Sequence, residues 1–180
     1  MRSRLFFKAP SLKTMMRALV LNIDVKTLRK VSSILLGLML VYGYCAHSFI
    51  LVANTTESLP FRFFALKKRM PPRIQAPQKG RYVYFVHERL NIPMIKQVKG
   101  VPGSRIHLDA NRRMWVDDFC IGTVRDTTST GKPLSALKES IVPAGYVFVY
   151  ATHERSFDSR YGEMGLVPVS AIKGSGIALI

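Results

Sequence analysis

Cysteine is scarce in this chain. The 180 residues include only Cys45 and Cys120, and Cys45 lies inside a long apolar segment. The part of the chain that follows this segment has a single cysteine, so it cannot close an internal disulfide. This excludes a small disulfide-stabilised scaffold, and we expect the stability of the folded domain to come from packing.

Acidic residues are also few. The sequence has 11 Asp and Glu residues against 27 Lys and Arg residues, and its net charge is +16. The positive charge is distributed along the chain. Residues 1–30 contain eight basic residues and one acidic residue, and all the other charged residues come after residue 53. Such a distribution permits contact with nucleic acid or anionic lipid, but it is more typical of a solvated surface. We therefore do not expect a nucleic-acid partner.

Charged residues are missing altogether from residues 31–53, VSSILLGLMLVYGYCAHSFILVA. A membrane-spanning helix needs about 20 apolar residues, so this segment is long enough to cross a bilayer. The basic flank at 1–30 favours a cytoplasmic N-terminal side. We predict a basic cytoplasmic segment at 1–30, one transmembrane helix at 31–53 and an external domain at 54–180. A cleavable signal peptide is the alternative, although its apolar region would be only about 7 to 15 residues long.

The external part contains short runs rich in Val, Ile, Tyr and Phe. Their lengths and their bounding Gly, Pro, Asn and Asp residues are typical of β-strands. Turn-forming residues occur at 102–103, 109–111 and 131–133. We therefore predict a mainly β domain with strands at 81–86, 94–101, 105–109, 113–117 and 145–150.

Motifs for metal catalysis and for a nucleophile elbow are missing. His87-Glu88 and His153-Glu154 resemble the start of a zinc-binding helix, but neither has the second histidine that such a motif requires. The pattern G-x-S-x-G does not occur either. A Ser-His-Asp triad stays open, because its members can come in any order. We expect no metal and no cofactor.

One lysine interrupts an apolar stretch in the predicted strand 94–101. Burial lowers the pKa of a lysine because it penalises the charged form, and a buried neutral lysine can accept a proton from a serine hydroxyl. Lys96 and Lys99 compete for this role, but on one strand they face opposite sides of the sheet. If Ile95 and Lys99 share the solvent side, Lys96 and Val98 point inward. Lys96 is thus the candidate base.

Three segments, in order, resemble the bacterial type I signal peptidase superfamily, and most closely its conjugative-transfer branch, the TraF-type peptidases. NTTESLP at 54–60 is similar to the segment that carries the nucleophilic serine. IKQVKGVPG at 95–103 is similar to the lysine box, and SFDSRYGEMGLVP at 156–168 to the final box. MWVDDFCIGTVRDTTSTGKPL at 114–134 also resembles the compact hairpin region of that branch. The resemblance covers residues 54–180 and implies a signal-peptidase-like β fold.

The resemblance implies a serine endopeptidase with a serine and lysine dyad. Ser58 matches the nucleophile and Lys96 the general base. The supporting positions are Thr56, which with the Ser58 backbone N–H lines the oxyanion hole; Ser156, which orients the lysine; and Asp158 with Arg160, which match a structural ion pair.

The implied substrate is a membrane-tethered, pilin-like precursor of a conjugation or type IV secretion apparatus, cleaved and in some relatives cyclised. The implied location is the bacterial inner membrane, with one span, a cytoplasmic N-terminus and a periplasmic catalytic domain. A general signal peptidase that acts on many exported proteins is the first alternative. The second is a non-catalytic scaffold of a DNA-transfer channel, with a basic patch at Lys67, Lys68, Arg69 and Arg73.

Overall fold

The structure is a computed structural model that describes residues 11, 13, 24–68 and 77–179. The chain divides into two compact units, Met1–Cys45 and Ala46–Ile180. Most of the predicted cytoplasmic segment at 1–30 lies outside the described residues, as do Arg69 and Arg73 of the basic patch.

One long helix, α2 (Val25–Ser48), covers most of the apolar segment and has no buried residue. Among the described residues it is the one helix that is long and apolar enough to cross a membrane. The predicted helix at 31–53 is wrong at its end, because Phe49–Ala53 forms strand β1. This strand pairs along its whole length with Phe63–Lys68. A continuous apolar run does not distinguish a helix from a buried strand, and here a partner strand decides the conformation.

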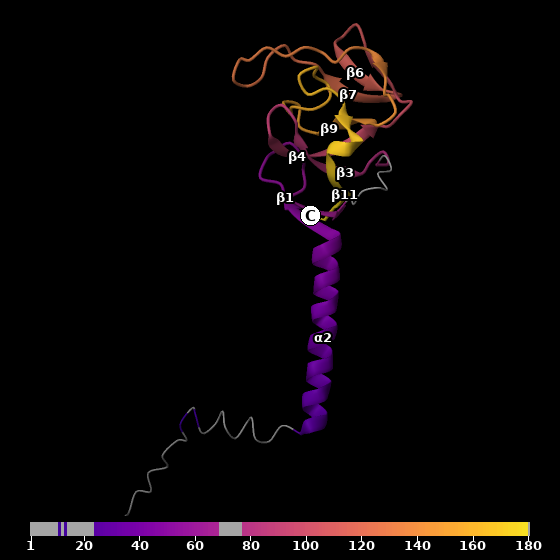
Figure 1. The fold of residues 1–180 in the computed structure, drawn as a ribbon. Helices are drawn as coiled ribbons and strands as arrows, with labels where there is room; N and C mark the ends of the chain where they lie inside the picture. The colour runs from indigo at the N-terminus through magenta and orange to yellow at the C-terminus, as the bar shows by residue number, and fades with distance from the viewer. Residues whose placement is uncertain (1–10, 12, 14–23, 69–76, 180) are drawn as a thin grey trace, which may run out of the picture. The chain divides into compact units, whose positions relative to one another are not determined.

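The second unit contains a seven-stranded sheet in the order β1-β2-β11-β3-β4-β9-β10, in which all neighbours are antiparallel (Figure 1). Strand β11 comes late in the sequence but lies between β2 and β3. It therefore joins the β1–β2 hairpin to the rest of the sheet. The strands are β1 (Phe49–Ala53), β2 (Phe63–Lys68), β3 (Tyr82–His87), β4 (Ile92–Gly100), β9 (Tyr146–Tyr150), β10 (Val167–Pro168) and β11 (Ile172–Ala178), with a short 3-10 helix, η1 (Val169–Ala171), before β11.

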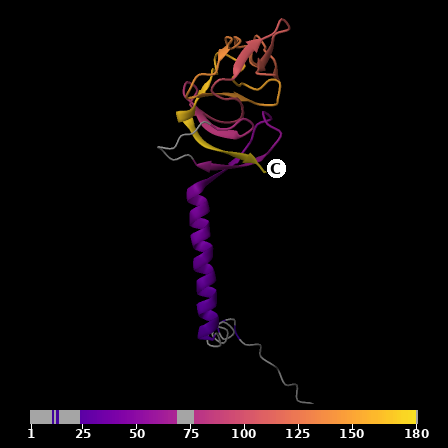
Figure 2. The same ribbon diagram turned by 90° about the vertical axis from the view of Figure 1, so that its right-hand side faces the viewer.

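A smaller sheet has the order β7-β6-β5-β8. Figures 1 and 2 both place β6 and β7 at the end of the second unit that is remote from β1. Turns with positive φ at Gly103 (91°) and Gly131 (79°) lie at the turn positions predicted from the sequence. The strands are β5 (Arg105–Leu108), β6 (Arg113–Val116), β7 (Phe119–Thr123) and β8 (Ser140–Ile141).

The large sheet is packed on both faces. Successive side chains of a strand point to opposite sides, and residues of β4 from both sides belong to hydrophobic cores. Val83 and Val98 belong to the core on one face, and Ile95 belongs to the core on the other. The prediction that Lys96 and Val98 are buried is confirmed, while the placement of Ile95 toward solvent is wrong. Ile95 is covered by the β1–β2 hairpin and its loop, which the local pattern of β4 could not reveal.

The mainly β architecture is as predicted. Each of the five predicted runs coincides with a strand, namely β3, β4, β5, β6 and β9, within one or two residues at each end. The predicted runs do not include β1, β2, β7, β8, β10 or β11.

Candidate active site

The loop that carries Ser58 connects β1 to β2, and Asn54 fixes its shape. The Asn54 amide nitrogen donates to the carbonyl oxygens of Leu59 and Phe61, both at 3.2 Å. Its amide oxygen accepts hydrogen bonds from the Thr56 backbone N–H at 3.1 Å and from the Thr56 hydroxyl at 2.8 Å. One side chain thus holds both ends of the loop. Asn54 was not singled out from the sequence, although an Asn two residues before a Thr is the pattern of an Asx turn.

The Ser58 and Thr56 hydroxyls are in direct contact, with 2.6 Å between Oγ and Oγ1. Thr56 has one hydroxyl proton, and it donates this proton to Asn54. While the Thr56 proton points to Asn54, the Ser58 hydroxyl is the donor in the contact between the two hydroxyls. In this arrangement Thr56 holds the Ser58 proton and has no proton to offer to an oxyanion, so such a role would require its hydroxyl to rotate away from Asn54.

The segment 151–153 contacts the Ser58 loop from the end of β9. The Ser58 carbonyl oxygen accepts hydrogen bonds from the His153 backbone N–H at 3.3 Å and from the Thr152 hydroxyl at 3.5 Å. Leu59, the next residue of the loop, packs in one apolar core with Ile95 and Ala151. The loop, strand β4 and the end of β9 therefore meet at one place.

Lys96 lies in β4 opposite Val83 of β3, and it is only 5% exposed. Burial lowers its pKa from 10.5 to about 8, while the nearby Asp158 carboxylate raises the pKa and the Arg160 guanidinium lowers it. Within the described residues, no hydrogen bond to the Lys96 amine is found, and none joins it to the Ser58 hydroxyl. A lysine in this state is partly neutral near pH 8 and can accept a proton.

Asp158 and Arg160 form a buried ion pair beside Lys96. The Arg160 Nε and Nη2 atoms donate to the two Asp158 carboxylate oxygens at 2.9 and 3.0 Å. Asp158 also accepts a hydrogen bond from the Ala151 backbone N–H at 3.1 Å. The pair thereby attaches the final box to the segment that contacts the Ser58 loop. Hydrogen bonding and attraction to Asp158 outweigh burial and raise the pKa of Arg160.

Ser156 is buried, and its hydroxyl oxygen has no hydrogen-bond partner among the described residues. A buried hydroxyl without a partner costs free energy, so it commonly marks a position where another group binds or moves. Over the same residues, no group of three or more His, Cys, Asp and Glu side chains could hold a metal ion. Cys45 and Cys120 are both exposed and unpaired.

Comparison with known proteins relates the chain to peptidases. Residues 25–180 match the family described as signal peptidase, peptidase S26. The conjugal transfer protein TraF of Agrobacterium fabrum is 32% identical over 84 residues, which is 46% of each chain. A probable conjugal transfer protein TraF of Sinorhizobium fredii is 28% identical over 108 residues, 58% of this chain and 56% of the relative. The chain thus matches about half the length of these two relatives.

Signal peptidase I of Buchnera aphidicola is 44% identical over 41 residues, which is 23% of this chain and 13% of the relative. Among solved structures, a signal peptidase I from Enterococcus faecalis V583 aligns with a TM-score of 0.37 and 20% identity, and the alignment covers 59% of this chain and 98% of that chain.

Proposed function

The chain belongs to the signal peptidase family S26, and we propose on this premise that it is a membrane-bound serine endopeptidase that uses Ser58 as nucleophile and Lys96 as general base. The observation that carries the proposal is the buried Lys96 amine, whose pKa is lowered to about 8. Near pH 8 a substantial share of such amines is neutral, whereas a lysine with an ordinary pKa would be almost entirely charged there and could not accept the serine proton.

The proposed reaction begins with transfer of the Ser58 proton to neutral Lys96. The Ser58 oxygen attacks the scissile carbonyl, and the peptide nitrogen leaves with the proton carried by Lys96. Water, or the amine of another peptide end, then releases the acyl group from Ser58. The absence of a direct Ser58–Lys96 hydrogen bond is compatible with this step, because catalytic hydrogen bonds are often long before substrate binds.

The surrounding residues have supporting roles in this proposal. The Ser58 backbone N–H and the Thr56 hydroxyl, once it has rotated away from Asn54, stabilise the oxyanion. The unpartnered Ser156 hydroxyl orients the Lys96 amine. Asp158 and Arg160 hold the final box in place and are structural.

We further infer that the substrate is a membrane-tethered, pilin-like precursor and that the partner is a conjugative transfer machinery. The two TraF-named relatives support this assignment over that of a general signal peptidase. For the DNA-transfer scaffold, Lys67 and Lys68 are the members of the basic patch within the described residues, and Lys68 donates to the Ala46 carbonyl at 2.6 Å. A patch in which a lysine is used internally is weaker support for DNA binding.

We further propose that the protein lies at the inner membrane with the second unit in the periplasm, and the candidate membrane-spanning helix α2 supports this location. An exposed apolar surface on β1, β2 and the end of β11 supports contact of this unit with the bilayer. Leu51 of β1, Phe63 of β2 and Ile177 of β11 are all more than half exposed. The register places Leu51 and Ile177 on either side of Ala65, so their side chains share one face.

The test is cleavage of the precursor by full-length protein in membranes. Ser58→Ala and Lys96→Ala should each abolish processing, whereas Lys99→Ala on the same strand should retain it. Continued processing by either of the first two variants would refute the dyad. Depletion of the protein separates the alternatives, because loss of conjugation alone indicates the narrow role and a general export defect indicates the housekeeping role.

A further inference from the structure

A pocket of about 560 Å³ lies beside the final box in the second unit. Three segments line it: the turn between β3 and β4 at Leu90, the loop after β7 at residues 125–134, and residues 155–163. Two of the lining residues, Arg155 and Phe157, are the immediate neighbours of Ser156. The pocket thus shares a segment of chain with Ser156, but none of the proposed catalytic groups lines it.

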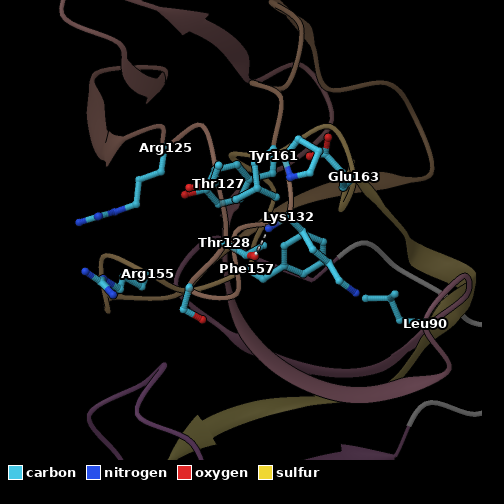
Figure 3. Close-up of a pocket in the computed structure, with 12 residues that line it drawn as sticks. Leu90, Arg125, Thr127, Thr128, Lys132, Arg155, Phe157, Tyr161 and Glu163 are labelled. Carbon is cyan, nitrogen blue, oxygen red and sulfur yellow. Dashed lines mark hydrogen bonds between the residues drawn. The ribbon is translucent and has the colours of Figure 1, made fainter.

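The floor of the pocket is aromatic and rigid. The Phe157 and Tyr161 rings stack with centroids 6.3 Å apart and an interplanar angle of 6°. Tyr161 is only 1% exposed, so its ring belongs to the core and supports the half-buried ring of Phe157, which supplies the accessible apolar surface. Figure 3 shows Phe157 and Tyr161 between Leu90 on one side and the two arginines, Arg125 and Arg155, on the other. Such a surface can take an apolar side chain from a ligand.

The rim of the pocket carries uncompensated positive charge. Arg125 forms an exposed ion pair with Glu154 at 3.1 Å. Lys132 and Arg155 also line the pocket, and within the described part of the chain neither side chain has an ion-pair partner. Two cations at the edge of an apolar floor therefore remain available to an anionic group.

Among the described residues, Glu163 is the one carboxylate that lines the pocket, and it already accepts hydrogen bonds. Glu163 accepts hydrogen bonds from the Ser135 backbone N–H at 3.0 and 3.2 Å and from the Ser135 hydroxyl at 2.8 Å. These contacts lower the pKa of Glu163 against the opposing effect of its burial. Glu163 therefore fixes the adjoining loop and does not neutralise Lys132 or Arg155.

We propose that this pocket is a second substrate-binding site, which takes a segment of the precursor protein that carries a carboxylate side chain next to a large apolar side chain. The apolar side chain would lie on Phe157, which Tyr161 supports from the core, and the carboxylate would pair with Lys132 and Arg155. Charge complementarity selects an anionic ligand, and the place of Arg155 and Phe157 on either side of Ser156 in the chain favours the polypeptide that is being cleaved over an unrelated partner. The inference rests on the proposed peptidase function and adds a determinant of its specificity away from the cut.

The test measures peptide binding by full-length protein in detergent micelles, in the Ser58→Ala background so that no turnover intervenes. The probe is a fluorescein-labelled 12-residue peptide with Glu-Leu-Phe at its centre. Matched peptides with Gln-Leu-Phe or Glu-Ser-Ser remove the charge or the apolar side chains separately. Fluorescence anisotropy gives the dissociation constants.

We expect the double variant Lys132→Gln, Arg155→Gln to weaken binding of the Glu-Leu-Phe peptide about tenfold or more, because two charge-assisted contacts are lost. The control is the double variant Lys138→Gln, Arg81→Gln, which makes the same change in net charge at exposed positions outside the pocket. The control should bind within about twofold of the parent. The Gln-Leu-Phe and Glu-Ser-Ser peptides should bind the parent more weakly than Glu-Leu-Phe.

Equal loss in the pocket and control variants would overturn the proposal, since it would indicate a general charge effect. Equal binding of the three peptides would also overturn it. A third contrary outcome is a pocket variant that binds the peptide normally but has lost binding to vesicles containing phosphatidylglycerol or to a single-stranded oligonucleotide. Cleavage of the precursor by the Ser58→Ala variant would instead refute the proposed catalytic function, and the anisotropy result would be unaffected.

Discussion

Replacement of Lys96 by methionine should stabilise the folded protein at neutral pH while it removes the proposed base. The Lys96 amine is buried, and its pKa is lowered from 10.5 to about 8 chiefly because burial desolvates the charged form. One pKa unit corresponds to about 1.4 kcal/mol, so folding with a charged Lys96 costs about 3 kcal/mol. Methionine is flexible and uncharged, so it can occupy the same apolar site without this cost.

The direction of the pH dependence follows from the two pKa values. Below pH 8 the lysine is charged in both the folded and the unfolded chain, and the full cost of burying the charge applies. Between pH 8 and 10.5 the folded protein loses the proton first and the cost shrinks. Above pH 10.5 the lysine is neutral in both states. The stabilisation by Lys96→Met should therefore be largest below pH 8 and disappear at about pH 10.5.

The measurement is thermal unfolding of the full-length protein in micelles, followed by the fluorescence of Trp115, the single tryptophan. For a folded unit of this size, a gain of about 3 kcal/mol raises the unfolding midpoint by about 10 °C. Lys138→Met, at an exposed position, should change stability by less than about 0.5 kcal/mol. The reasoning is refuted if the Lys96→Met midpoint does not rise at pH 7, or if it rises equally at pH 10.5.

Three further outcomes are expected. Proteolytic activity, measured as kcat/KM on a precursor peptide, should rise about tenfold from pH 7 to 9, because Lys96 is mostly neutral only above its pKa of about 8; a flat profile contradicts the role of Lys96. Asn54→Ala removes the hydrogen bonds that hold the Ser58 loop, so it should lower kcat/KM at least tenfold with a smaller change in KM. Equal kinetics for the variant and the parent would exclude a positioning role for Asn54. Gly176→Ala should destabilise the protein by about 2 kcal/mol or more in urea unfolding, because a Cβ at this position would overlap the Ala65 carbonyl oxygen of strand β2. Ser175→Ala is the control. Parent-like unfolding of Gly176→Ala would show that β11 and β2 can separate enough to admit the Cβ.

A strand can be predicted from the sequence when its own residues determine its conformation, and it cannot when contacts with distant segments do so. Strands β3, β4 and β9 have their own apolar runs and turn residues, and they were predicted from these alone. Strand β1 lies at the end of an apolar segment and becomes a strand because β2 pairs with it, which is a contact with residues beyond the local sequence. Strand β11 contains two glycines that allow close approach to β2, and no short-range pattern places it between β2 and β3.

The candidate site divides in the same way. The burial of Lys96 could be predicted from its strand position, and the Asp158–Arg160 pair was expected from the similarity of the final box. The Thr56–Asn54 hydrogen bond could not be assigned from residue types, since several polar side chains in NTTESLP could have acted as its donor or its acceptor. The pocket beside Phe157 depends on the meeting of three distant segments, so no sequence motif indicated it.

The position of β11 has a consequence for biosynthesis. The hairpin that presents Ser58 and the strand that bears Lys96 share no backbone ladder of their own, and β11 is the element that bridges them. During translation, residues 172–178 leave the ribosome after both. Until then the backbone pairings that join the hairpin through β11 and β3 to β4 cannot form, so the sheet that carries the proposed nucleophile and base is completed only after residues 172–178 have been synthesised.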